Sequence, residues 1–175
     1  MFKTLYLSAL LFGLLQAATP AQTQLEVIKA RAEESAKAML ANDFGKLADL
    51  TYPKVVELMG GRAKMIAYLE KEIGKMRADG FDFLSANIGQ PGAVIKSGDK
   101  LFSVVPMTLK MKVPGGVLRS ESFLLGIAGA DGRAWTFVSG AGMDEPRMKL
   151  IIPEAVGKVP LPPFKEPVLE KNPTP

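Results

Sequence analysis

The sequence predicts an α+β protein in which three N-terminal helices pack on a strongly curved antiparallel sheet of about five strands, followed by a short C-terminal helix and a proline-rich tail. Two observations predict this class. Apolar residues recur every three or four positions up to residue 78 and every second position after Gly80, as expected for a helix face and a strand face respectively. Glycine- and proline-rich turns separate the strand segments.

The first helix is expected to begin at Gln24, because Thr23 and Glu26 have the spacing of a capping box. Asparagine and aspartate at positions 42–43 end it, and Gly60-Gly61 must interrupt the helical region that follows. Further helices are expected over residues 62–78 and after Asp43 and Asp144, which can cap them. Pro53 suits the first position of another short helix.

Five strands are expected after Gly80, and their short connections predict antiparallel hairpins. In the third strand apolar residues alternate with Thr108, Lys110 and Lys112, so one face should be apolar and the other hydrated. The expected strands are residues 81–88, 93–96, 101–113, 117–128 and 133–139.

The N-terminus has the pattern of a secretion signal: Lys3, an apolar run over residues 5–15, and small residues over 16–21. An apolar run this short does not span the roughly 30 Å of a bilayer core as a helix, so we expect cleavage and no retained membrane span. The expected organisation is a signal peptide over residues 1–21 and a single domain over 22–153, with a periplasmic or secreted location.

The composition excludes several chemistries. The chain has no cysteine and no histidine, which removes thiol nucleophiles, disulfides, Ser-His-Asp triads and the usual metal ligands, so no cofactor and no metal site are expected. The net charge of +4 and the few aromatic residues among the basic ones do not favour a nucleic-acid partner.

The tail over residues 154–175 is expected to be extended and unpacked, because seven of the thirteen prolines lie between residue 153 and the C-terminus. Its Val159-Pro160-Leu161-Pro162-Pro163-Phe164 stretch could alternatively dock on a partner or across the domain. One hypothesis is therefore an interaction module of the cell envelope that acts through this tail.

The order of elements resembles the nuclear transport factor two-like superfamily, the cone-shaped fold shared with ketosteroid isomerases and polyketide cyclases. The resemblance covers residues 24–152 and rests on the helix order, on the segments 41–44 and 53–61, and on a last strand that carries Ala134-Trp135-Thr136-Phe137-Val138. It implies a cavity between helices and sheet, which is packed shut, binds a small apolar molecule or hosts catalysis, and by analogy a homodimer.

Our main hypothesis is a non-catalytic domain that binds a small apolar ligand or a protein partner in its cone. Aromatic and methionine side chains that alternate inward on the strands are the candidate ligand contacts, although the same spacing is typical of plain core packing. These candidates are Phe83, Met107, Met111, Trp135 and Phe137.

The alternative is a hydrolase or isomerase that uses pocket carboxylates. Arg119 and Glu121 share a strand face with apolar residues, and Asp82 lies on a strand that could bring it near them. Charges in an apolar row can be catalytic when they are desolvated, but a surface ion pair is the simpler interpretation. The two tyrosines outside the expected signal peptide, Tyr52 and Tyr68, do not occupy the positions that an isomerase of this superfamily implies.

Overall fold

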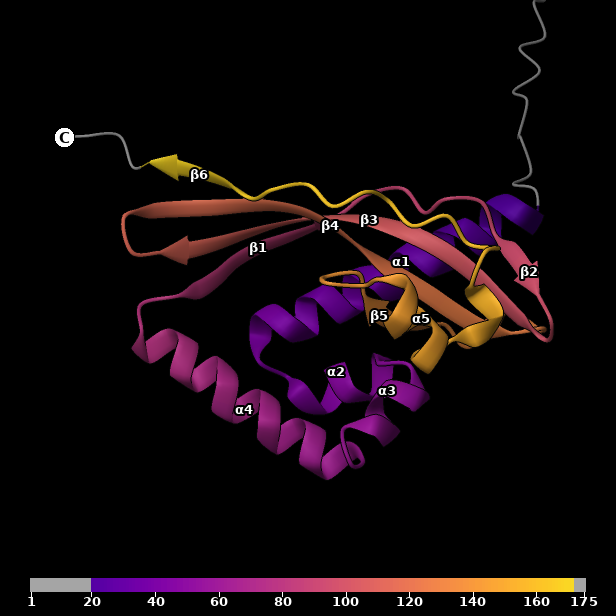
Figure 1. Ribbon diagram of the computed structural model, residues 1–175, viewed down its shortest axis with the longest axis horizontal. Helices are drawn as coiled ribbons and strands as arrows, with labels where there is room; N and C mark the ends of the chain where they lie inside the picture. Colours follow the sequence, from indigo (N-terminus) through magenta and orange to yellow (C-terminus); the bar gives the residue numbers. More distant parts are fainter. Residues whose placement is uncertain (1–19, 172–175) are drawn as a thin grey trace, which may run out of the picture.

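The computed structural model describes residues 20–171, and it shows an α+β fold in which helices are followed by an antiparallel sheet (Figure 1). The fold class expected from the sequence is confirmed. The expected signal peptide lies almost entirely outside the described residues. Within residues 20–171, no helix is both long enough and apolar enough to cross a lipid bilayer.

In the described part of the chain, four α-helices precede β1 and one follows β5. Asp43 caps the second, where its carboxylate accepts a hydrogen bond from the Lys46 backbone N–H at 2.9 Å. Gly60 and Gly61, both at positive φ, separate the third from the fourth. The helices are α1 (Pro20–Ala41), α2 (Phe44–Leu50), α3 (Pro53–Leu58), α4 (Arg62–Ala78), α5 (Glu145–Ile151) and the 3₁₀ turn η1 (Pro153–Ala155).

The start of α1 differs from the expectation. The helix is already formed at Pro20, so Thr23 lies inside it and is not the N-terminal cap. Proline is well suited to a first helical turn, because its fixed φ is helical and its missing N–H would have no intrahelical partner there. The capping-box spacing was therefore a wrong indicator of this boundary.

The sheet has the strand order β1-β3-β4-β5, with β2 paired to β3 and β6 paired to β4, all antiparallel. Its centre is the long β3–β4 hairpin, which keeps one register from Lys100↔Gly129 to Val113↔Gly116. The strands are β1 (Asp82–Ile88), β2 (Ile95–Ser97), β3 (Lys100–Val113), β4 (Gly116–Gly129), β5 (Thr136–Ser139) and β6 (Val168–Lys171).

Both faces of the sheet are covered in the half that contains β5. We call them the α1 face and the α5 face, after the helix that packs on each. Neighbouring residues of β4 alternate between the two cores, with Leu124 on the α1 face and Leu125 on the α5 face. The α1-face core is Ile28, Ala32, Val105, Met107, Leu124, Ala128, Trp135 and Phe137. The α5-face core is Phe102, Phe123, Leu125, Ile127, Val138, Met148, Ile152, Ala155 and Val159.

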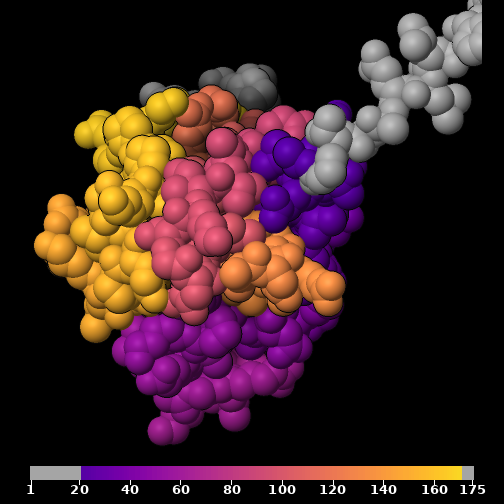
Figure 2. Space-filling model, turned by 90° about the vertical axis from the view of Figure 1, so that its right-hand side faces the viewer, coloured from indigo at the N-terminus to yellow at the C-terminus, as the bar shows by residue number. Residues whose placement is uncertain are grey.

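This arrangement corrects the expectation of an unpacked tail. Ala155 and Val159 are buried in the α5-face core, and Leu161 packs against it. Residues 162–170 are exposed but end in β6, a strand that no turn or alternation in the sequence indicated. Figure 2 shows the C-terminal segment lying directly beside the β2–β3 region. The proline count predicted extension correctly and missed the burial, because burial depends on partners elsewhere in the chain.

The last expected strand is shorter than predicted, since β5 begins at Thr136 and Arg133–Trp135 lies in a loop. The Trp135 indole N–H donates to the Gly132 carbonyl at 3.0 Å, which holds this loop folded back on itself. Trp135 is nevertheless fully buried and shares the α1-face core with Phe137, as the expected inward alternation requires.

Candidate functional site

An apolar cavity of about 230 Å³ lies between the α1 face of the sheet and the helices α1 to α4. Side chains from four helices and three strands line it, so it occupies the space between helices and sheet at the middle of the fold. The lining residues are Ser35, Ala36, Met39, Leu47, Thr51, Val55, Met65, Leu69, Met107, Leu124, Phe137, Val138 and Ser139.

The cavity wall carries no charged side chain among the described residues. Its polar groups are three hydroxyls, and two of these already have partners. The Thr51 hydroxyl donates to the Leu47 carbonyl at 2.8 Å, and the Ser139 hydroxyl accepts from the Ala141 backbone N–H at 3.2 Å. A charged ligand buried here would lose its hydration without compensation, whereas an uncharged apolar ligand would gain from burial.

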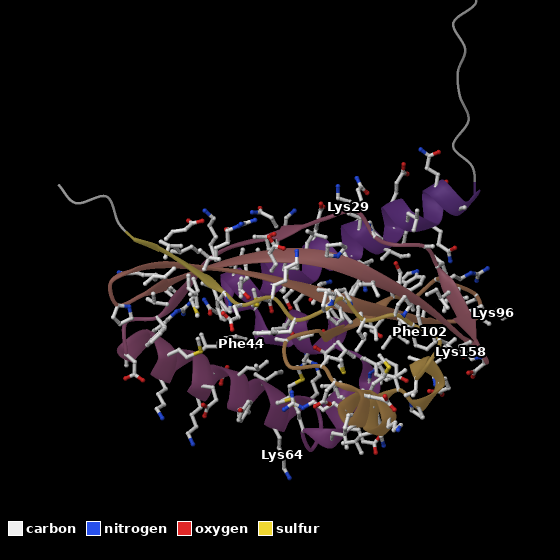
Figure 3. All side chains as sticks on the ribbon, turned by 45° about the horizontal axis from the view of Figure 1, so that its top comes forward. Lys29, Phe44, Lys64, Lys96, Phe102 and Lys158 are labelled. Carbon is white, nitrogen blue, oxygen red and sulfur yellow. The ribbon has the colours of Figure 1, made fainter. Side chains whose placement is uncertain are left out.

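Small residues make room for the cavity. Ser35 and Ala36 are buried on the α1 wall, where larger side chains would fill the space. Opposite them, Met65 and Leu69 lie one turn apart on the inward face of α4. Figure 3 shows the two sides of α4: Phe44 lies between α4 and the sheet, and Lys64 of α4 projects away from the sheet.

Gly126 helps to place the aromatic wall. A Cβ atom at this position would lie 3.2 Å from the Phe137 ring and 3.3 Å from the Trp135 ring. The missing side chain lets both rings approach β4 closely, and Phe137 also lines the cavity.

The five candidate ligand contacts fall into three groups. Met107 and Phe137 line the cavity. Trp135 lies behind this wall, packed in the core rather than lining the cavity. Phe83 and Met111 are cross-strand partners farther along the same sheet face, beyond the lining residues.

The three candidate catalytic residues are not brought together. Asp82 pairs with Arg77, with 3.0 Å between the Oδ1 and Nε atoms. Arg119 and Glu121 form an exposed ion pair at 3.2 Å, and Glu121 also accepts from Lys165 at 2.6 Å. The Lys165 hydrogen bond, with a smaller contribution from Arg119, lowers the pKa of Glu121.

Glu121 borders a second, more open depression on the sheet, next to Asn87, Thr108 and Ser122. Neither Arg119 nor Asp82 lines it. The lowered pKa keeps Glu121 ionised, and its neighbours in the depression are uncharged. The geometry therefore offers a solvated ion pair at this place rather than a desolvated acid or base.

A partly buried ion pair joins the C-terminal segment to the sheet. Lys100 donates to Glu154 in a short contact, and the Ser97 hydroxyl donates to the Glu154 backbone carbonyl at 2.7 Å. The Lys100 hydrogen bond lowers the pKa of Glu154, and the same bond raises the pKa of Lys100, with a contribution from Tyr52. These contacts hold η1 in place and stand apart from the cavity. Among residues 20–171, no cluster of acidic side chains could hold a metal ion.

Sequence reasoning missed the helical half of the cavity wall. The helical residues of the wall belong to the periodic apolar faces of the helices, and only the small residues at positions 35 and 36 distinguish this part of the interior. These helical wall residues are Met39, Leu47, Met65 and Leu69. Small side chains opposite methionines were the available signal, but they do not identify a cavity without the positions of the helices.

Comparison of the chain with protein-family models, with curated proteins and with solved structures finds no match. The site therefore has to be interpreted from its own geometry and chemistry.

Proposed function

We propose that this protein binds a small, uncharged, apolar molecule in the cavity between α1, α4 and the sheet. The observation that carries the proposal is a wall of methionine, leucine, valine and phenylalanine side chains around about 230 Å³, with no charged group in it. Ligand sites are typically concave and mainly apolar, with few polar groups that fix orientation. The resemblance to the cone-shaped superfamily, which rests on the order of elements, supports the same interpretation.

The cavity volume limits the ligand. An engineered apolar cavity of about 150 Å³ binds benzene, whereas drug-sized ligands occupy roughly 300–1,000 Å³. We therefore propose a molecule between these sizes, such as one substituted ring or a short alkyl chain. Flexible methionine side chains at the wall suit a ligand whose shape is not strictly specified.

We do not propose catalysis. The cavity presents only hydroxyl groups, and general acid–base or nucleophilic catalysis would need an activated group within reach of a bound molecule. We also propose that the mature protein acts in the periplasm or outside the cell, on the basis of the signal pattern at its N-terminus.

The test is to fill the cavity. In Ala36→Leu the added side chain enters the cavity from α1, and we expect it to abolish binding of n-butylbenzene, measured by ligand-induced chemical-shift changes and by the thermal shift of the protein. Filling a cavity commonly stabilises a protein by about 0.5–2 kcal/mol, so loss of binding without loss of stability is the expected result.

The matched control is Ala30→Leu, which makes the same change on the exposed side of α1 and should leave binding unchanged. If the wild-type protein does not bind n-butylbenzene at its solubility limit, or if both variants change binding equally, the cavity is not a ligand site.

A further inference from the structure

A second group of apolar side chains lies on the α1 face beyond the cavity. Phe83, Met111, Leu118 and Leu169 are cross-strand neighbours in a row across β1, β3, β4 and β6. We call this row the distal strip. Leu169 is 47 % exposed and the other three are partly exposed, and none of the four belongs to either core.

The distal strip is continuous with the cavity. Met107, Leu109 and Met111 are alternate residues of β3, so their side chains point to the same sheet face. Met107 lines the cavity and Met111 belongs to the strip, and a separation of four positions along a strand spans about 13 Å. The apolar surface therefore extends well beyond the cavity.

The helix α4 runs from the cavity toward the end of the sheet that carries the strip. Met65, Leu69, Ile73 and Met76 form one stripe along α4, and its first two members line the cavity. The last turn of α4 joins directly to β1, where the Phe81 backbone N–H donates to the Met76 carbonyl at 2.9 Å. Figure 1 shows α4 running beneath the sheet toward the β3–β4 turn.

Ile73 and Met76 are also only partly buried. The strip and the last two members of the α4 stripe are thus two apolar rows that are not closed into either core. An occupant that fills the small cavity and also lies along the strip has to be thin and flexible. Apolar surface that extends from a ligand cavity is typical of a binding groove.

We propose that the ligand is a single-chain amphiphile, whose chain end occupies the cavity and whose remaining methylenes lie along the distal strip. This inference rests on the proposed function and adds the class of the ligand and the direction in which it lies. The apolar end enters the cavity, and the polar head stays in water near the β3–β4 turn. Phe83 and Met111 then contact the middle of the chain, and Met107 and Phe137 contact its end.

The test uses a series of straight-chain alcohols from hexanol to dodecanol, with affinity measured by displacement of a fluorescent apolar probe. Scaled from benzene in about 150 Å³, the cavity holds about nine carbons, so hexanol fits inside it. We expect the affinity to keep rising from nonanol to dodecanol, by about twofold to fourfold for each methylene, because the added methylenes are buried on the strip.

Met111→Gln keeps the side-chain length and makes the strip polar. It should reduce the gain in affinity from nonanol to dodecanol at least fivefold and leave the affinity for hexanol unchanged. The matched control is Lys112→Gln, the next residue of β3 on the opposite sheet face, which should change neither.

The outcomes separate the two proposals. Suppose that hexanol binds and that Ala36→Leu abolishes its binding. If the affinity then stops rising at nonanol, or if Met111→Gln does not change the affinity of the longer alcohols, the amphiphile inference fails and the cavity site stands. If hexanol does not bind, both fail. If sedimentation shows a wild-type dimer that Met111→Gln dissociates, the strip is covered by a second copy of the chain and the inference is overturned.

Discussion

Val159→Ala measures how strongly the C-terminal segment is docked on the sheet. Val159 is 5 % exposed and belongs to the α5-face core with Met148 and Ile152. The substitution removes two buried carbon atoms, which at about 0.8 kcal/mol each gives roughly 1.6 kcal/mol before any residual cavity is counted. We expect the free energy of unfolding to fall by about 2 kcal/mol.

The measurement is urea unfolding followed by circular dichroism, with the midpoint compared at unchanged slope. For a domain of this size, the expected loss also lowers the melting temperature by about 4–8 °C. The control is Phe164→Ala in the same segment, because this side chain is 81 % exposed and its removal should stay within about 0.5 kcal/mol. Equal effects of the two substitutions, or an effect of Val159→Ala below 0.5 kcal/mol, would refute the docking of this segment.

Three further predictions follow from the same contacts. Deleting residues 164–175 should leave the melting temperature nearly unchanged, whereas deleting residues 154–175 should lower it strongly because it removes buried core residues; equal shifts in differential scanning calorimetry would contradict this. The Glu154 carboxylate has a lowered pKa in the folded state. The stability that it contributes is therefore fully present above its ordinary pKa of 4.5 and is lost as the pH falls through the lower folded value. In Glu154→Gln, the free energy of unfolding measured with urea should be less sensitive to acid in that range. Gly126→Ala should destabilise the fold by about 1–3 kcal/mol and weaken binding of n-butylbenzene, because the new methyl group crowds the aromatic wall of the cavity; unchanged affinity would show that this wall does not contact the ligand.

The sheet could be predicted because its signals are local. The alternation in β3 and β4 and the Pro114-Gly115 turn specify a hairpin without reference to the rest of the chain. Similarly, Asp43 and Pro53 mark the starts of α2 and α3 through their own side chains. For these elements the expected positions were correct to within one or two residues, whereas the local capping-box signal at Thr23 gave a wrong start for α1.

The C-terminal segment could not be predicted in this way. Its composition predicts an extended segment, but the burial of Ala155 and Val159 depends on the positions of Phe123 and Ile127 on the α5 face of the sheet. The hydrated face expected from Thr108, Lys110 and Lys112 is found in that half of β3. The other half of the same face is covered, because Phe123 and Ile127 of β4 pack there with α5 and the C-terminal segment, and the pattern in β3 alone does not indicate this.

The candidate site was partly predicted. Inward alternation named Met107 and Phe137 as candidate ligand contacts, and both line the cavity, since both belong to strands whose faces are fixed by the pleat. Their contact with a ligand stays a prediction. Whether a buried position borders a void or a neighbouring side chain depends on the separation between α1 and α4, and this separation has no signature in the residue order. Trp135 illustrates the limit, because it is as buried as Phe137 but lies behind the cavity wall.

The division of β4 between two cores has a consequence for the order of folding. Ile28 and Trp135 belong to one core, and Phe102 and Val159 belong to the other, so each core joins segments that are far apart along the chain. Neither can close until most of the polypeptide is available, and contacts of such long range make folding slow. During synthesis, the N-terminal helix therefore waits for its packing partners, because Val105, Leu124 and Trp135 all follow it by more than 60 residues.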